Sequence, residues 1–530
     1  MSTIVVCSML HESAHRNSAT RRFRGEPVLA WTMRRLALTT QIERVVVLAW
    51  DDQLNDLSDI DVNARACGGR RDSQAMRSVA AARRWADGWR GGLLQSCWFD
   101  NGFAAELVRD AMNDELADAV VLVDPAAGLV DPHIVDDLAT AGLAGTRDMY
   151  FTPAAPGLGG VLLKRPLVEK LAAERWMPGR LVHYLPDAPA LDPITSDACV
   201  AVPLDASRTI GRFALDSDRQ CRRVEAATVP LNGTLISTHA AAVAKRIASA
   251  PWRGPLPRDI TLELTTRRHS RPIFSPAAHL QIDRPDVSLE HVEALAAELA
   301  GHDDTRVTLA GVGDPLLHAN AIAIARRLST VAAVSIETDL LGMSAEQVKE
   351  LAAAGVDVVA VHLPARTPQT YARIMGVDRL AEAVDNIKRL IEARQRSGGG
   401  VPVVAPVFVK TVENFDEMEA WYDTWLRALG SAVITGPSTY GGRIADCGVA
   451  DMTPPVRRAC RRLDDRVTIL SDGGIVACEQ DPTGDMRLGR IGDDRLTDVW
   501  QGTLSRLNDR HKRLVAIPQL CSNCNEWHRP

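Results

Sequence analysis

The sequence has no run of about 18 apolar residues, the length that a helix needs to cross a bilayer. Its first residues, Ser2 to Cys7, lack the basic segment of a signal peptide and predict a short strand instead. Neither an internal repeat nor a long low-complexity tract is present. These absences favour a globular protein of the cytoplasm, with no membrane as its partner.

An excess of charge of either sign is also missing. Charged residues make up 24% of the chain, hydrophobic residues make up 46%, and the formal net charge is −6. Such a mildly acidic chain gives no reason to expect nucleic acid as a partner. At 530 residues the chain is too long for one hydrophobic core, so we expect about two to four domains.

Cysteine is absent from a long central stretch, between Cys221 and Cys447, and is concentrated near the carboxyl end. The ten cysteines form no obvious disulfide framework, as is usual in a reducing compartment. Four of them could make up one ligand set: Cys460, Cys478, Cys521 and Cys524. Thiolates from such distant points converge only if something holds them, and that is usually a metal ion or an iron–sulfur cluster.

Three occupants of a four-cysteine site are compatible with this spacing. A 4Fe–4S cluster and a structural zinc ion both use four thiolates, and both often include a CxxC pair such as Cys521 and Cys524. Free thiols or a redox-active CxxC pair are the third alternative. Arginines surround Cys460 in the segment Arg457 to Arg462, which we expect to be a helix. We expect some of them to face an anionic cluster and others to face solvent.

The first block of the chain, residues 1–250, alternates strands and helices. Its clearest elements are a strand at Ile4 to Leu10, a helix at Pro27 to Leu38, a strand at Arg44 to Trp50, a helix at Ala104 to Leu116 and a strand at Ala119 to Val123. This order predicts an α/β domain with an open, doubly wound sheet.

The second block, residues 255–450, follows a linker rich in glycine and proline and alternates more regularly. Its six strand-like runs are Ile260–Leu264, Val307–Ala310, Val334–Glu337, Val356–His362, Val401–Val409 and Ala432–Thr435. The helical stretches between them are Ser288–Leu299, His318–Leu328, Ser344–Ala354, Leu380–Arg394 and Asn414–Leu429. The alternation predicts a six-unit partial (β/α) barrel, and residues 454–530 form a third, small cysteine-rich domain.

Polar and small residues follow the strands of this second block. Gly311 to Pro315 follows the second strand, Glu337 to Asp339 closes the third, and His362 closes the fourth. Ligands of parallel α/β folds bind at the carboxyl ends of the strands, so we expect a binding site there. We interpret His362 as a hydrogen-bonded strand-end histidine rather than a catalytic one.

The second and third blocks together resemble a radical SAM protein with a C-terminal SPASM domain. The run from Gly311 to Leu317 is similar to that family's GGEP-type motif, and Ile336 to Asp339 is similar to the pattern of its next strand. The tail resembles the SPASM pattern in the runs DGGIVACEQD, LGRIG and DVW and in its closing cysteine pair.

This resemblance implies roles for particular residues. Cofactor-binding positions would be Gly311, Gly313, Asp314 and Glu337, with the small residues admitting the methionine end of SAM and the acid pairing with its amino group. An auxiliary 4Fe–4S cluster would be held by Cys460, Cys478, Cys521 and Cys524. The alternative for the glycines and Asp314 is a tight turn in which Asp314 caps the following helix.

One motif of the family is missing. Radical SAM enzymes bind their catalytic 4Fe–4S cluster through C-x3-C-x2-C after the first strand, and the corresponding residues here are Arg268, Pro272 and Ser275. Arginine is a cation, proline has no ligating side chain, and serine is a poor ligand for soft metals. These three residues therefore do not replace three thiolates. We therefore expect a degenerate radical SAM domain that does not cleave SAM, while SAM binding remains an open alternative.

The first block resembles the nucleotide-sugar cytidylyltransferases. Gly25 to Thr32 is similar to the start of that family's first helix, and Val121 to Pro125, with Asp131 following, is similar to its metal-binding strand end. The resemblance implies Mg²⁺ at Asp124, for which a role in a strand-end turn is the alternative. The loop from Ser8 to Arg24, which would hold the triphosphate, contains four arginines but neither lysine nor glycine.

Three functions are compatible with these patterns. The first is a SPASM-type iron–sulfur protein that binds a small-molecule or peptide substrate, with a peptide, a sugar and a nucleotide as the candidate ligands. The second is an NTP-dependent nucleotide-sugar transferase whose second half is a scaffold. The third is a non-catalytic adaptor for a protein partner, with a structural zinc or iron–sulfur site.

Overall fold

The computed structural model describes residues 2–10, 20–68, 74–91, 93–187, 192–209, 211–250 and 252–529. The chain divides into two compact units, Met1–Trp252 and Arg253–Pro530, and the boundary between them along the chain falls in the predicted linker. Within the described residues, every helix is too short or too polar to be a membrane-spanning segment.

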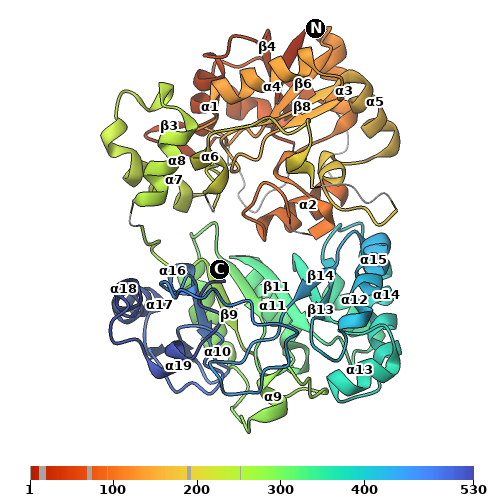
Figure 1. Cartoon of the computed structure of the whole chain (residues 1–530), viewed down its shortest axis with the longest axis vertical. Helices are drawn as coiled ribbons and strands as arrows, with labels where there is room; N and C mark the ends of the chain where they lie inside the picture. Colours follow the sequence, from red (N-terminus) through yellow and green to blue (C-terminus); the bar gives the residue numbers. More distant parts are fainter. Residues whose placement is uncertain are drawn as a thin grey trace. The chain divides into compact units, whose positions relative to one another are not determined.

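The first unit is built on a six-stranded sheet with the order β5-β4-β1-β6-β8-β7 (Figure 1). Its strands are β1 (Thr3–Ser8), β4 (Arg44–Trp50), β5 (Ala64–Cys67), β6 (Ala119–Val123), β7 (Met149–Phe151) and β8 (Val161–Lys164). Strands β5, β4, β1 and β6 pair in parallel with their neighbours in the sheet, whereas β8 runs antiparallel to both β6 and β7. The predicted doubly wound sheet is therefore confirmed, with an antiparallel edge.

Both faces of this sheet are buried. On β1, Val5 and Cys7 enter one hydrophobic cluster, whereas Ile4 and Val6 enter another. The first cluster is completed by α1 (Val28–Leu36), α4 (Pro132–Ala144), α6 (Leu204–Arg208), α7 (Asp218–Thr228) and α8 (Ala240–Ser249), and the second by α2 (Gln74–Arg84), α3 (Ala105–Asp114) and α5 (Arg165–Glu174). A strand that is apolar on both faces is typical of a parallel sheet covered by helices on each side.

The second unit contains six parallel strands in sequence order, as predicted (Figure 1). These strands are β9 (Asp259–Leu262), β10 (Arg306–Leu309), β11 (Ala333–Thr338), β12 (Val358–His362), β13 (Val403–Val409) and β14 (Val433–Thr435). Each is paired in parallel with the next along the chain. Their carboxyl ends therefore lie at one edge, which we call the barrel mouth.

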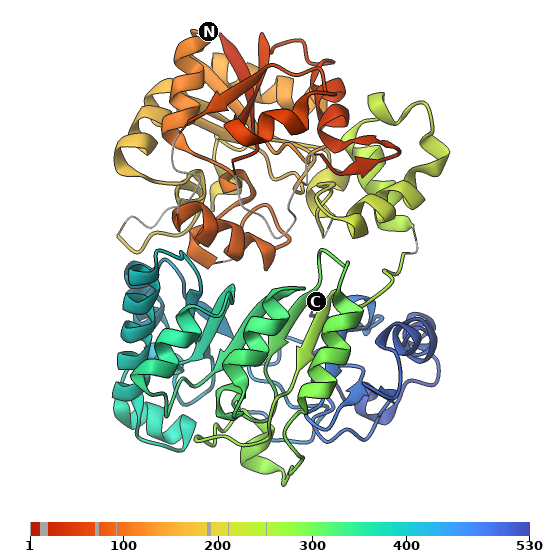
Figure 2. The same ribbon diagram turned by 180° about the vertical axis from the view of Figure 1, so that it is seen from behind.

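The longer helices of the second unit cover one face of these strands (Figure 2). They are α10 (Leu289–Leu299), α11 (Ala321–Ser329), α12 (Ala345–Ala352), α14 (Leu380–Ser397) and α15 (Met418–Leu429), whereas the short helices α9 (Pro276–His279) and α13 (Pro368–Met375) lie beyond the strand ends (Figure 1). Alternate strand residues differ accordingly: Ile336 of β11 is fully buried, whereas its neighbour Glu337 is exposed on the opposite, inner face. The five predicted helices are present, and the two short helices α9 and α13 were not predicted.

The cysteine-rich tail continues the same sheet. Strand β15 (Arg466–Ile469) pairs in parallel with β9, and β16 (Gly474–Val476) and β17 (Gly489–Arg490) follow as antiparallel strands. Trp500 and Leu507 of the tail belong to the same hydrophobic cluster as the barrel strands. The tail also contains α16 (Arg462–Asp465), α17 (Leu496–Val499), α18 (Ser505–Arg513) and α19 (Gln519–Ser522). Barrel and tail therefore share one core within the second unit.

Candidate functional site

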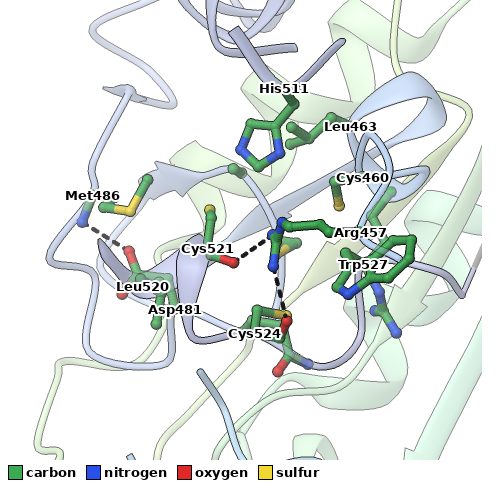
Figure 3. A pocket seen from close by; sticks show the side chains of 14 residues that line it. Arg457, Cys460, Leu463, Asp481, Met486, His511, Leu520, Cys521, Cys524 and Trp527 are labelled. Atoms are coloured by element: carbon green, nitrogen blue, oxygen red, sulfur yellow. Dashed lines mark hydrogen bonds between the residues drawn. The ribbon is translucent and has the colours of Figure 1, made fainter. Parts of the chain in front are cut away.

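The four cysteines of the tail line one cavity, which we call the cysteine cavity (Figure 3). Cys460 lies in a loop shortly before α16, Cys478 follows β16, Cys521 lies in α19, and Cys524 lies in the turn after it. The prediction that Cys460 lies on a helix is wrong. The chain around it is irregular after the two prolines at 454 and 455, and the helix begins only at Arg462.

Arg457 forms hydrogen bonds with the backbone of the CxxC turn, which contains Cys521 and Cys524. Its Nη2 donates to the carbonyl of Cys521 at 2.6 Å, and its Nη1 lies 3.4 Å from the carbonyl of Cys524. The guanidinium carbon lies 5.8 Å from the ring centroid of Trp527, which also lines the cavity. One positive charge is thus held beside two of the cysteines.

Arg462 places a second guanidinium at the cavity, 7% exposed and paired with acidic residues. It forms ion pairs with Glu526, at 3.1 Å, and with Glu479. The backbone N–H of Glu526 in turn donates to the sulfur of Cys524 at 3.2 Å. Arg457 and Arg462 line the cavity, whereas Arg458 and Arg461 are exposed. The arginines around Cys460 are therefore divided between the cavity wall and solvent.

The histidine at position 511 is the most buried ionisable side chain of the cavity wall, at 1% exposed. Neither of its ring nitrogens has a hydrogen-bond partner among the described residues. Burial, with a contribution from Arg457 and Arg510, lowers the pKa of His511 to about 4, so the ring is neutral at neutral pH.

Burial also controls the protonation of the thiols. It raises the pKa of Cys478 to about 12, and, together with neighbouring Cys460 and Cys524, it raises the pKa of Cys521 to about 12. The thiols therefore stay protonated near neutral pH unless a cation binds them. Four thiols, two guanidinium groups and an N–H donor to sulfur suit an anionic thiolate–metal group, so the donor set fits an iron–sulfur cluster.

The four cysteines share one cavity wall. In the part of the chain that the structure describes, no three His, Cys, Asp or Glu side chains are placed to hold one metal ion.

A second polar site lies at the barrel mouth and includes Arg268, the residue that the sequence comparison sets at the first cysteine position of the family motif. Its Nε donates to Asp339 Oδ2 at 2.9 Å, and its Nη2 donates to the other oxygen of the same carboxylate. The side chains of Arg268 and Asp339 are 6% and 1% exposed. Ser270 also donates its hydroxyl to Asp339. The segment after β9 is therefore joined to the end of β11 by a buried, bidentate ion pair.

Asp339 is kept ionised by this network. Burial opposes its charged form, but the Arg268 guanidinium outweighs burial and holds the pKa of the carboxyl well below its usual range. Nδ1 of His362 lies 3.3 Å from Asp339 Oδ1 and 3.1 Å from Nη2 of Arg268. The expectation that His362 is hydrogen-bonded at the strand end agrees with these contacts.

The side chain of Asp314 is occupied by the protein itself. Its carboxylate accepts from the backbone N–H of Leu316 at 3.0 Å, from the hydroxyl of Thr338 at 2.9 Å and from the N–H of Asp339 at 2.8 Å. Burial and the neighbouring Asp339 carboxylate raise its pKa. These contacts favour the capping role for Asp314, at the start of a short 3-10 turn rather than a longer helix.

The glycines of the same motif are also explained by internal packing. A Cβ on Gly311 would lie 2.6 Å from the Glu263 side chain, and a Cβ on Gly313 would lie 2.3 Å from the carbonyl oxygen of Thr265. Glu337 is exposed on the inner face of β11. Among the four predicted cofactor-binding residues, Gly311 and Glu337 are exposed, whereas Gly313 and Asp314 are buried.

In the first unit, Asp124 lines a small cavity at the carboxyl ends of β1 and β6, together with Ser8 and Asn101. Its Oδ1 accepts from the backbone N–H of Ala126 at 2.8 Å, which is a strand-end turn. Most of the loop expected to hold a triphosphate, including Arg16, lies outside the described residues.

Comparison with known proteins identifies the second unit. Residues 269–424 match the family model of the radical SAM superfamily, and residues 460–525 match the SPASM model, an iron–sulfur cluster-binding domain. The second unit has the radical SAM/SPASM architecture. The radical SAM match begins one residue after Arg268.

Individual relatives are distant. An uncharacterized protein of Treponema pallidum (strain Nichols) is 26% identical over 274 residues, which are 49% of this chain and 74% of that protein. Streptococcus suis SuiB, solved bound to its precursor peptide SuiA, is 11% identical, with a TM-score of 0.39 over 68% of this chain and 90% of its own. A cytidylyltransferase from Leptospira borgpetersenii is 13% identical, with a TM-score of 0.31 over 47% of this chain and 98% of its own.

Sequence reasoning missed the histidine of the cysteine cavity. His511 lies in the basic run Arg510 to Arg513, which suggests a solvated helix face. However, Leu504, Leu507 and His511 recur at helical spacing, and all three are buried. This periodicity is the signal that could have identified it.

Proposed function

We propose that this chain is an iron–sulfur protein of the radical SAM/SPASM type that holds one 4Fe–4S cluster in the cysteine cavity and does not cleave SAM. The observation that carries the proposal is that one candidate cluster site has cysteines and the other has none. The cavity of the tail is lined by four cysteines, whereas the segment of the barrel that would bind the catalytic cluster contains Arg268, which forms a buried ion pair with Asp339. When bound, a 4Fe–4S group supplies one-electron transfer.

A cluster is favoured over zinc at the cysteine cavity. The SPASM match spans all four cysteines and is a match to a cluster-binding domain. Arg457 contributes a positive charge that offsets part of the negative charge of four thiolates and their metal atoms.

The absence of SAM cleavage is supported by chemistry at the barrel mouth. Three thiolates are needed to hold the catalytic cluster, and Arg268, Pro272 and Ser275 supply none. Because the guanidinium of Arg268 is buried and bonded to both oxygens of Asp339, it could not move aside without leaving a buried carboxylate unpaired.

We place the ligand of this protein at the barrel mouth, as a peptide, a sugar or a nucleotide, and the protein itself in the cytoplasm. The exposed carboxylate of Glu337 on the inner face supports the first point, and ten cysteines without a disulfide among the described residues support the second. A protein partner that docks on an inactive barrel is the alternative to a small ligand.

The test uses the full chain, purified without oxygen and analysed for iron, sulfide and zinc. We expect about four iron atoms per chain, because four thiolates are the usual ligand set of one 4Fe–4S cluster. Incubation with SAM and dithionite should yield no 5′-deoxyadenosine. Release of 5′-deoxyadenosine would overturn the proposed loss of SAM cleavage, and zinc in place of iron would overturn the proposed cluster.

A nucleotidyltransferase activity of the first unit is a second candidate, because Asp124 lines a cavity at the carboxyl ends of parallel strands. Mg²⁺-dependent turnover of CTP with sugar phosphates, measured by pyrophosphate release, tests it. Turnover that is lost in Asp124→Ala would support this candidate, whereas the absence of turnover with any nucleotide would count against it.

A further inference from the structure

The wall of the cysteine cavity contains a buried histidine neither of whose ring nitrogens is hydrogen-bonded by the described residues. His511 is 1% exposed, and both ring nitrogens lack a partner among the described residues. It points into the cavity from α18, on the side of Cys460 and Cys521 (Figure 3). A buried polar group without a partner is costly, and such groups in native proteins usually meet a bound ligand, ion or water.

The position would otherwise suit an apolar residue. His511 continues the buried face of Leu504 and Leu507 at helical spacing, and the cavity wall around it includes Leu463 and Leu520. A leucine at 511 would fill the same face without an unsatisfied donor. The imidazole therefore contributes something that the apolar packing does not need.

The terminal guanidinium nitrogens of the other cationic side chains of the cavity are engaged with the protein, although Nε of Arg457 has no partner among the described residues. Both terminal nitrogens of Arg457 donate to backbone carbonyls of the CxxC turn, and Arg462 is paired with Glu526 and Glu479. These contacts hold the two arginines in place. The ring nitrogens of His511 have no such contact, so its N–H is available to whatever occupies the cavity.

We propose that His511 donates its ring N–H to a sulfur of the iron–sulfur group in the cysteine cavity and thereby raises the reduction potential of that group. The inference rests on the proposed function, because it requires a cluster at this site. Hydrogen bonds to cluster and cysteine sulfurs stabilise the more negative, reduced form and are one of the means by which proteins set the potential. His511 is a positioning and tuning residue here, not a ligand.

The N–H of the ring gives the effect its character. Both the neutral and the protonated imidazole carry at least one N–H donor. Its influence is therefore that of a short-range hydrogen bond, which an uncharged donor of similar reach can imitate. Gln offers such a donor, whereas Phe fills a similar volume and offers none.

The experiment is a spectroelectrochemical titration of the anaerobic, cluster-loaded full chain. Relative to wild type, His511→Phe should shift the midpoint potential to more negative values, and His511→Gln should return it toward the wild-type value. His528→Phe is the matched control, since His528 also has an unpartnered Nδ1 in the described tail but does not line the cavity. The control should leave the potential unchanged.

Iron analysis separates the two proposals. If His511→Phe retains about four iron atoms per chain with an unchanged potential, the tuning role is refuted while the proposed cluster stands. If wild type itself contains no iron, the proposed function fails. Complete loss of iron in both His511 variants would also refute the inference, because it would indicate a ligand rather than a hydrogen-bond donor.

A second measurement needs no variant at position 511. Wild-type protein labelled with ¹⁵N-histidine and reduced by one electron should show a weak nitrogen hyperfine coupling in pulsed electron–nuclear double resonance. No coupling to any histidine would refute the hydrogen bond. A strong coupling, as from nitrogen bound to iron, would refute it in favour of direct ligation.

Discussion

Replacing Arg268 by methionine would leave the carboxylate of Asp339 buried without its guanidinium partner. The two side chains are 6% and 1% exposed, so solvent cannot take over the lost contacts. Removal of one member of a buried ion pair typically costs about 3–5 kcal/mol, because an uncompensated charge remains inside the protein. We expect Arg268→Met to lower the free energy of unfolding of the second unit by about this amount.

The next residue in the chain offers a matched control. Arg267 pairs with Asp286 at 2.5 Å, but these side chains are 60% and 34% exposed. Exposed ion pairs contribute about 0–1 kcal/mol, so Arg267→Met should cost far less than Arg268→Met. The double variant Arg268→Met/Asp339→Leu should recover most of the lost stability, because it removes the buried charge as well.

The pH dependence of the loss has a definite sign. In the wild type the folded-state pKa of Asp339 lies below its unfolded value, so its contribution to stability is present above the unfolded pKa and is lost only in strong acid. Without Arg268, burial opposes the charged carboxylate and only Ser270 and His362 still favour it, so the folded-state pKa of Asp339 should rise. The cost of the variant should therefore be largest at neutral and higher pH and should shrink as the pH falls and Asp339 takes up a proton.

Urea unfolding, combined with hydrogen exchange of peptides from β11, measures this change in the second unit specifically. Equal stability of the Arg268→Met and Arg267→Met proteins at pH 7 would refute the interpretation. It would mean that the ion pair between Arg268 and Asp339 does not stabilise the second unit.

Two further predictions concern the turn after β10. Asp314→Ala should lower the free energy of unfolding by about 1–3 kcal/mol, because the buried donors of Leu316, Thr338 and Asp339 lose their acceptor. Glu337→Ala is its control and should change the free energy of unfolding by less than about 0.5 kcal/mol in the same urea titration. Gly313→Ala should cost about 1–3 kcal/mol, because its Cβ would lie 2.3 Å from the carbonyl oxygen of Thr265. Gly502→Ala is its control, with the nearest atom 4.0 Å away, and equal stability of the two alanine variants would contradict the packing argument.

The barrel could be predicted from sequence because its pattern is local. Buried strands and capped helices alternate along the chain, and Val403–Val409 and Val433–Thr435, for example, fall within the predicted runs. The pairing of β15 with β9 could not be predicted, because it joins Val467 to Ile260 and depends on tertiary packing alone. The short helix α13 has a sequence signal, a Thr367 cap followed by proline, but only eight residues.

The site shows the same division between local and tertiary information. The four cysteines could be grouped from their spacing, and the structure brings them to one cavity. The sequence shows that Arg268 stands where a cysteine is expected, but it does not show that Asp339 lies opposite, since their separation along the chain is 71 residues. His511 was hidden by the basic residues on either side of it.

The most direct test of a cluster in the cysteine cavity is the iron and sulfide content of the Cys521→Ala/Cys524→Ala variant, prepared anaerobically beside wild type and Cys447→Ala. Cys447 is partly exposed and does not line the cavity, so its replacement controls for the loss of a thiol. We predict about four iron atoms per chain in wild type and in Cys447→Ala, and essentially none in the double variant. Iron that persists in the double variant would place the cluster elsewhere and contradict the proposal.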